Sequence, residues 1–189
     1  MDALKLLTAD HNRVRGLFKR FKDAEEKDDS GTMAEVSPKI LEELEVHTTI
    51  EEEIFYPTVR RGSEEIEDLV KEGIEEHAVA KNLVGELRGM EPGAETFAPK
   101  MKVLIESVEH HAEEEETEMW KEIRKSFDSQ TLEELATKLE ARKKELGAPT
   151  LDDKLDLTEE QLKSLAQEQE IPGRSKMSHE ELAATVAPS

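Results

Sequence analysis

Apolar residues recur along this chain at alternating steps of three and four, which is the period of an amphipathic α-helix. Four long stretches follow this pattern, and polar, glycine or proline residues separate them. The pattern predicts helices over residues 3–23, from Ser37-Pro38 to about 57–62, over 63–89 with Ser63 as N-cap, and over about 95–127. Because the connections are short, neighbouring helices should run antiparallel. The predicted fold is therefore all-α, an up-down-up-down four-helix bundle.

One histidine interrupts the apolar stripe of each predicted helix, at a position where a core side chain is expected. A buried imidazole needs polar partners, so four imidazoles that converge on one core favour a metal site. On the second and fourth helices a glutamate follows the histidine by four residues and shares its helix face. The six candidate ligands are His11, His47, Glu51, His77, His111 and Glu115.

The first two predicted helices look like a copy of the last two. Asp10-His11 aligns with Glu76-His77 at an offset of 66 residues (77 − 11), and Val46-His47 aligns with His110-His111 at an offset of 64 (111 − 47). Such a two-fold arrangement suits a pair of metal ions, each with two histidines and with two shared glutamates. An oxo or hydroxo bridge would add a fifth donor, so an octahedral ion would keep one open position.

Composition limits the chemistry. The 189 residues include 46 acidic and 26 basic side chains, a net charge of −20 (26 − 46), which disfavours phosphate backbones and anionic membranes as partners. Cysteine is absent, so disulfides and thiolate ligands are excluded. Imidazole and carboxylate without thiolate suit iron or manganese. With no signal-peptide pattern and no run of eighteen apolar residues, we expect a soluble cytoplasmic protein.

Four segments carry the candidate ligands: Asp10-His11, HTTIEEEIFYP at 47–57, Glu76-His77, and HHAEEEE at 110–116. Together they make roughly residues 3–127 resemble the hemerythrin-like, HHE cation-binding family. The resemblance implies a non-haem di-iron centre that binds or reacts with dioxygen, hydrogen peroxide or nitric oxide, or that senses oxygen or iron. Gly73 and Lys81 flank His77 where oxygen carriers have a second histidine, and Glu115 replaces their aspartate. These departures disfavour reversible oxygen carriage and favour oxidant handling, such as a catalase-like reaction.

Several neighbouring residues allow a plainer interpretation. His110 with Glu114 is an alternative ligand pair, although the alignment favours His111. For Tyr56 the alternatives are an approach to the site and boundary packing, of which we expect the second. We expect the residues preceding His11 and His77 to lie at the surface, with a hydrogen bond to an imidazole as the alternative. The remaining glutamates of the two acidic segments should be solvated, namely Glu52, Glu53, Glu113, Glu114 and Glu116. A sensor without turnover and a metal-free acidic scaffold remain alternative functions.

The C-terminal third is predicted to contain three further helices. A capping box at Thr131 and Glu134 starts a fifth helix against the bundle, which completes a domain over residues 1–147. Residues 148–156 read as a linker. Residues 157–189 form a tail of helix, extended loop and helix, with capping boxes at Thr158 and Ser178.

The tail resembles the helix-extended-helix motif at the N-terminus of the terminator Rho and in SAP-like modules. That resemblance implies nucleic-acid contact through Arg174 and Lys176. However, four bases face seven acids between residues 154 and 189, a balance of −3 (4 − 7). Since nucleic-acid-binding surfaces are usually basic, a docking or packing role is at least as good an interpretation.

Overall fold

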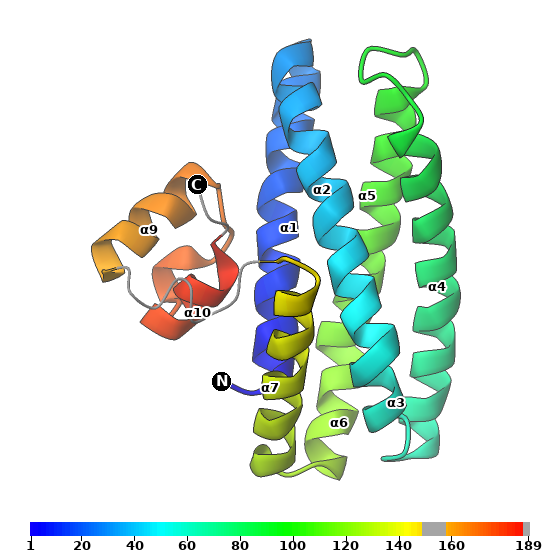
Figure 1. Ribbon diagram of the computed structural model, residues 1–189, viewed down its shortest axis with the longest axis vertical. Coiled ribbons are helices and arrows are strands. Elements are labelled where there is room, and N and C mark those ends of the chain that lie inside the picture. The colour runs from blue at the N-terminus through cyan, green and yellow to red at the C-terminus, as the bar shows by residue number, and fades with distance from the viewer. Residues whose placement is uncertain (149–157, 187–189) are drawn as a thin grey trace.

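The computed structural model describes residues 1–148 and 158–186, and the regular structure in these two ranges is helical. Four antiparallel rods form the bundle in Figure 1. Helix α1 packs against α2 and α4 packs against α5, while contacts of α2 with α4 and of α1 with α5 close the ring. The all-α four-helix bundle is therefore confirmed. The rods are α1 (Ala3–Glu26); α2 (Ser30–Ile50), η1 (Glu51–Phe55) and α3 (Tyr56–Val59); α4 (Glu64–Arg88); and α5 (Phe97–Glu114), η2 (Glu115–Met119) and α6 (Trp120–Ser126).

The second rod starts earlier than its sequence suggests. Helix α2 begins at Ser30, not near Pro38, because the side chain of Asp29 caps its first turn. The early turns also bury Met33 and Val36, which extends the apolar stripe toward the N-terminus. Pro38 is tolerated inside the helix on its exposed side. A proline therefore need not mark a helix start when burial and a cap favour an earlier one.

Both rods that carry a candidate glutamate contain a π-helical turn at that residue. The turn η1 starts at Glu51 and the turn η2 starts at Glu115. A π turn contains one residue more than an α-helical turn, so the positions that face the core shift by one residue along the sequence. Phe55 and Tyr56 are consequently buried, whereas Ile54 is only partly buried. The alternating steps of three and four predict a buried side chain at Ile54, three residues after Glu51. This prediction is therefore wrong beyond Glu51.

Two apolar clusters fill the bundle, one on each side of a polar layer. The first lies toward the α1–α2 connection and includes Phe18, Phe21 and Leu104. The second lies toward the end of α6 and includes Leu7, Phe55 and Ile123, among others. Each fully buried side chain of this size contributes about 1.5–3 kcal/mol to folding. The polar layer between them is thus held in a rigid, well-packed frame.

A further helix, α7 (Ser129–Glu145), covers one side of the bundle beside α1, as predicted. Its N-cap is Asp128, whose side chain accepts a hydrogen bond from the backbone N–H of Thr131. The predicted capping box at Thr131 and Glu134 is therefore wrong by three residues. Leu132, together with the other buried leucines of the helix, joins the second apolar cluster.

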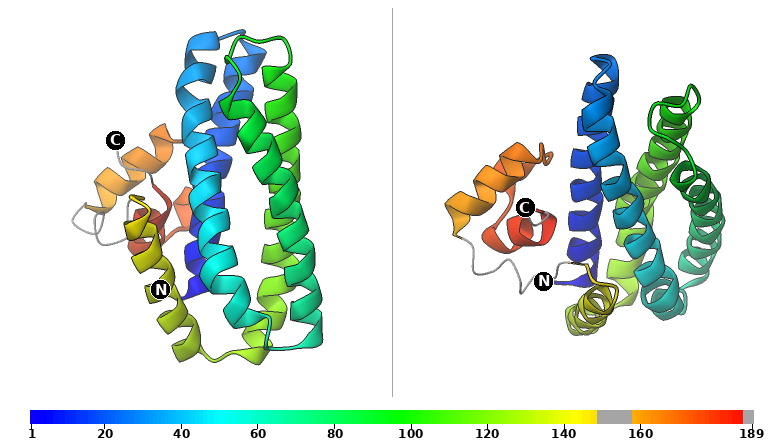
Figure 2. Two further views of the ribbon diagram at one scale, coloured as in Figure 1. Left: turned by 45° about the vertical axis from the view of Figure 1, so that its right-hand side comes forward. Right: turned by 45° about the horizontal axis from the view of Figure 1, so that its top comes forward.

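The tail forms a small helical unit beside α1, as the two views of Figure 2 show. Both predicted capping boxes are present, at the starts of the two helices. The unit has its own apolar cluster, which includes Leu162 and Leu182. Its elements are α9 (Glu159–Glu168), η3 (Arg174–Lys176) and α10 (His179–Thr185).

The structure leaves some predictions about the C-terminal third untested. Apart from residue 148, the predicted linker 148–156 lies outside the described residues. The resemblance of the tail to Rho-like and SAP-like motifs stays a prediction. Among the described helices, none combines the length and the apolar composition that crossing a membrane requires.

Candidate metal centre

The polar layer brings together one histidine from each rod. The Nε2 atoms of His11 and His47 lie 3.1 Å apart, and those of His77 and His111 also lie 3.1 Å apart. All four rings are buried, with at most 9% of their surface exposed. The prediction that these four side chains converge from different helices on one core is confirmed.

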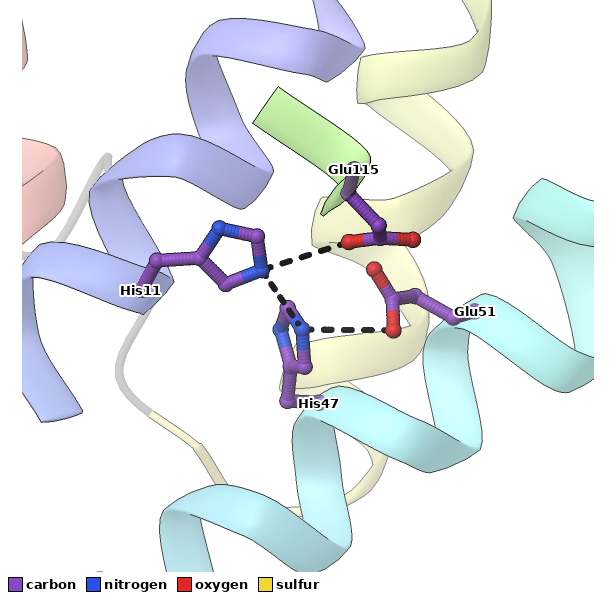
Figure 3. A group of neighbouring side chains, drawn as sticks. All are labelled: His11, His47, Glu51 and Glu115. Atoms are coloured by element: carbon purple, nitrogen blue, oxygen red, sulfur yellow. Dashed lines mark hydrogen bonds and ion pairs between the residues drawn. The ribbon is translucent and has the colours of Figure 1, made fainter. Parts of the chain in front are cut away.

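Two buried glutamates join the two histidine pairs. Glu51 Oε2 lies 3.2 Å from His47 Nε2 and 3.3 Å from His77 Nε2. Glu115 Oε2 lies 3.4 Å from His11 Nε2 and 3.8 Å from His111 Nε2. Each carboxylate oxygen therefore faces one ring of each pair, and all six predicted residues meet. Figure 3 shows the half of this arrangement formed by His11, His47, Glu51 and Glu115.

The donor atoms fit a pair of metal ions. Both carboxylate oxygens of Glu51 and Oε2 of Glu115 are buried without a hydrogen-bond partner, which is costly unless something else binds them. Two imidazole nitrogens bound at about 2.1 Å to one ion, at right angles, are about 3.0 Å apart. The 3.1 Å separation within each pair matches that requirement. The described residues include two ligand groups that share Glu51, one with His11, His47 and Glu115, the other with His77 and His111.

The outer nitrogens of three rings are held by carboxylates. Glu116 Oε1 lies 2.8 Å from His11 Nδ1, and Glu52 Oε1 lies 3.0 Å from His77 Nδ1. Glu76 Oε2 lies 2.7 Å from Nδ1 of His111. An ionised carboxylate only accepts hydrogen bonds, so each of these Nδ1 atoms donates, and the Nε2 atom of a neutral ring is left to direct its lone pair at a metal ion in the centre.

The fourth ring has a different outer environment. Nδ1 of His47 lies 3.8 Å from Asp10 Oδ2 and has no hydrogen-bond partner. Asp10 Oδ1 instead accepts hydrogen bonds from Lys143 of α7, at 2.6 Å, and from Arg13, at 2.7 Å. Arg13 also donates to the carbonyl oxygen of Ala184 in α10, at 2.9 Å. A buried charge network therefore connects His47 to the fifth helix and to the tail.

Charges inside the layer shift its proton affinities strongly. Burial disfavours the charged form of His11, but Glu115 and a second adjacent carboxylate outweigh burial and raise its pKa to about 9. Burial and the charge of His111 lower the pKa of His77 to about 4. Burial and the charge of Glu115 raise the pKa of Glu51 to about 7. Without metal the layer therefore retains protons near neutral pH, and a bound cation must displace them.

The two halves of the centre differ in one aromatic residue. The hydroxyl of Tyr56 donates to Glu115 Oε1 at 2.9 Å and lies 3.4 Å from Nε2 of both His77 and His111. At the corresponding position of the other half, Trp120 stacks on His11 with ring centroids 6.2 Å apart. The expectation that Tyr56 is boundary packing is therefore wrong, because the π turn rotates it into the centre.

The alternative pair of His110 and Glu114 lies outside the centre. The His110 side chain is 65% exposed and faces Glu114 at 3.4 Å on the bundle surface. Its neighbour His111 occupies the buried position that the internal alignment favours. Glu53 and Glu113 are exposed, as expected.

Sequence reasoning missed the carboxylates that surround the rings. Glu52 and Glu116 were expected to be solvated. The acidic residues before His11 and His77 were expected at the surface, with a hydrogen bond to an imidazole as the alternative. All four face a ring of the centre. The internal repeat could have found them, because each occurs at the same place in both halves. A residue with no role in the polar layer would have no reason to be acidic at the equivalent position of both halves.

A four-helix bundle with two imidazole pairs joined by carboxylates in its core has the architecture of a helical cation-binding protein. The family comparison agrees: the description "Hemerythrin HHE cation binding domain" matches residues 2–123. The chain belongs to the hemerythrin HHE cation-binding domain family.

Individual relatives support this assignment to different extents. A DNA nickase of Nostoc sp. strain PCC 7120 is 27% identical over 148 residues, which are 77% of this chain and 40% of that protein. An uncharacterized hemerythrin-like protein of Schizosaccharomyces pombe is 26% identical over 108 residues, 57% of this chain and 52% of that protein. The match thus spans about half of each relative or less.

A solved structure supports the fold. The hemerythrin HHE cation binding domain-containing protein of Mycobacterium kansasii is similar, with a TM-score of 0.62 and 19% identity. The similarity covers 98% of this chain and 99% of that chain. At this identity the likeness concerns the arrangement of helices alone.

Proposed function

We propose that this is a non-haem di-iron protein that binds or reacts with a small oxidant, namely dioxygen, hydrogen peroxide or nitric oxide. The observation that carries the proposal is the position of Glu51 Oε2 and Glu115 Oε2, each within 3.2–3.8 Å of one ring from both histidine pairs. Nitrogen and oxygen donors without thiolate suit iron. When bound, two irons would supply two electrons and the site two protons to cleave one hydrogen peroxide to water, and would regain both electrons from a second hydrogen peroxide that leaves as dioxygen, which is why we favour peroxide decomposition of the catalase type.

The protein's own residues provide the surroundings for such chemistry. The rings and carboxylates offer four donors to one ion and three to the other, which leaves room for an external ligand. Tyr56 Oη holds a proton 2.9 Å from Glu115 Oε1, and burial raises the pKa of this hydroxyl well above its usual range. Apolar clusters lie on both sides of the layer along the rods and hold the rings in place. The site can therefore orient a small oxidant beside a proton donor.

The test combines metal analysis with a peroxide-consumption assay on the same sample. We expect about two irons per chain, a near-ultraviolet charge-transfer band that bleaches on reduction, and consumption of hydrogen peroxide. The double variant His47→Ala with His111→Ala should lose the iron and the band, since it removes one nitrogen from each pair. His110→Ala is the matched control, because its exposed side chain lies next to His111 and outside the centre. Full iron occupancy in the double variant would refute the ligand assignment.

A sensor without turnover is the second candidate function. The observation in its favour is the buried chain of contacts from His47 through Asp10 and Arg13 to Ala184 in the tail. Metal binding at His47 can alter this chain. In that case iron loading should change hydrogen exchange in α10 while hydrogen peroxide is not consumed. Equal exchange in α10 with and without iron would remove this candidate.

Nucleic acid remains a proposed partner for the tail alone. The Nostoc relative is described as a DNA nickase, but this chain carries a net charge of −20, which opposes binding to phosphate backbones. In the tail, Arg174 already donates to the carbonyl of Ile171. Salt-dependent binding of the full chain to duplex or single-stranded DNA would support the proposal, and its absence at low salt would end it.

A further inference from the structure

A large cavity leads from the polar layer to the surface between the rods. Its volume is about 350 Å³. All four imidazoles of the centre line it, whereas Glu51 and Glu115 do not. A ligand in the cavity would therefore approach the rings from the side opposite the two bridging carboxylates. Its walls are apolar and come from α1, α2, α4 and α5, with Val14, Leu44, Ala80, Val84 and Val108 among them.

The cavity is much larger than the small oxidants require. A water molecule in the liquid occupies about 30 Å³, and hydrogen peroxide is only slightly larger. An apolar cavity of about 150 Å³ already accepts benzene, and pockets for organic ligands begin at about 300 Å³. A volume of about 350 Å³ therefore fits an organic molecule roughly twice the size of benzene.

Charged groups around the cavity already have partners. At its mouth Arg88 pairs with Glu45, and Lys81 pairs with Glu52 at 2.6 Å. Deeper in the cavity, Glu43 pairs with Arg13, and the Asp10 and Glu76 carboxylates are engaged as described above. A charged ligand would find no free counter-charge among these lining groups. The lining therefore favours an uncharged occupant.

The mouth beside α4 is open. A methyl group added at Gly85, which lines the cavity, would meet no atom within 4 Å. By contrast, a methyl group at Gly73, which lies earlier in α4, would lie 3.0 Å from the hydroxyl of Tyr56. The space beside Gly85 is therefore free of protein atoms.

We propose that this cavity binds an uncharged, apolar organic hydroperoxide of about ten non-hydrogen atoms. Its hydrocarbon part lies against the valine, leucine and alanine walls, and its oxygen atoms lie at the imidazoles. The choice of a hydroperoxide rests on the proposed function, which places oxidant chemistry at these rings. The cavity itself explains why the ligand is organic and neutral.

Binding can be measured in the metal-free full-length protein with 1-naphthylamine, an uncharged probe of about eleven non-hydrogen atoms whose fluorescence shifts in apolar surroundings. We expect the probe to bind and cumene hydroperoxide to displace it. Val84→Phe fills the cavity and should weaken probe binding about tenfold or more. Val79→Phe is the matched control: it makes the same change on the same helix, but Val79 is 54% exposed and points away from the cavity. It should bind the probe as the wild type does.

A thermal unfolding curve for each variant keeps the test interpretable. If Val84→Phe does not fold, Val108→Phe fills the same cavity from α5. Failure of the probe to bind the wild type, failure of cumene hydroperoxide to displace it, or unchanged binding in a folded cavity variant would each overturn the inference.

Hydrogen peroxide consumption by the iron-loaded wild type separates this inference from the proposed function. If hydrogen peroxide is not consumed while cumene hydroperoxide still displaces the probe, peroxide decomposition fails and the cavity assignment stands. If hydrogen peroxide is consumed but nothing displaces the probe, the cavity assignment alone is overturned.

Discussion

Three of the four histidines of the centre use both of their ring nitrogens. Nε2 faces the second ring of its pair, while Nδ1 of three rings faces a carboxylate at 2.7–3.0 Å. Such a carboxylate fixes the ring orientation and makes the inner nitrogen a stronger metal ligand. The proposed metal site therefore depends on the outer carboxylates as well as on the six residues that surround the centre.

Removal of one outer carboxylate should weaken metal binding without removing a ligand. We expect Glu52→Gln and Glu116→Gln each to lower metal affinity about 10–100-fold, because the amide no longer fixes the ring of His77 or His11 as strongly. Glu118→Gln is the control, since Glu118 is exposed two residues beyond Glu116. Competition with a metal chelator measures the affinities. Equal affinities in all three variants would show that the outer carboxylates do not support the ligands.

Two glycines of α4 should respond in opposite directions to the same substitution. At Gly73 an added methyl group would lie 3.0 Å from the Tyr56 hydroxyl and 3.3 Å from His111 Cε1, so Gly73→Ala should displace both and lower iron occupancy. At Gly85 the added methyl group meets open space, so Gly85→Ala should raise stability by up to about 1 kcal/mol through helix propensity. Denaturant unfolding and iron analysis of both variants test this. A Gly73→Ala variant with full iron occupancy would contradict it.

At the scale of the elements, helical period and capping determine the long helices, whereas tertiary packing determines the π turns that interrupt them. The 3.6-residue period and the cap at Ser63 predicted α4 correctly, because both depend on residues within one turn of each other. The π turns at Glu51 and Glu115 could not be predicted this way, since no local pattern in the sequence marks the extra residue. They are the reason why Tyr56 reaches the centre. One unpredicted turn thus changed the interpretation of a functional residue.

The contact of α7 with the bundle includes one buried ion pair beside its apolar packing. Lys143 is 1% exposed, and its Nζ atom donates to Asp10 at 2.6 Å. Truncation of one partner leaves a buried charge with fewer partners, so we expect Lys143→Met to destabilise the fold by about 3 kcal/mol. Lys144→Met is the matched control, because Lys144 is exposed and should change stability by less than about 0.5 kcal/mol. Chemical unfolding measures both. A Lys143→Met variant as stable as the control would mean that the pair does not hold α7.

For the molecule as a whole, protons and metal ions compete for the same nitrogen and oxygen atoms in the core. The pKa of His11 rises from 6.5 to about 9 in the metal-free fold, so the folded state binds its proton more tightly than the unfolded chain does. The resulting stability is fully present below pH 6.5 and is lost as the pH rises through about 9. The metal-free protein should therefore lose up to about 3 kcal/mol between pH 6.5 and pH 10.

Unfolding in denaturant with a chelator present, at pH 6.5 and pH 10, measures this loss. His11→Gln should remove most of the difference, because glutamine does not titrate. Iron-loaded protein should instead keep its stability at the higher pH, since bound metal replaces the proton. Equal stability of the metal-free wild type at both pH values would contradict the prediction.

The amino-acid sequence was sufficient for the rods, for most of their ends and for the six side chains that meet in the core. Helical period, capping and the internal repeat reveal these features because they depend on short, regular spacings along the chain. Packing determined the rest. The outer carboxylates, Tyr56 and the network through Asp10, Lys143 and Arg13 join residues that are far apart in the chain. The apolar cavity likewise requires four rods to be in place around it, and no single segment encodes that distance between helices.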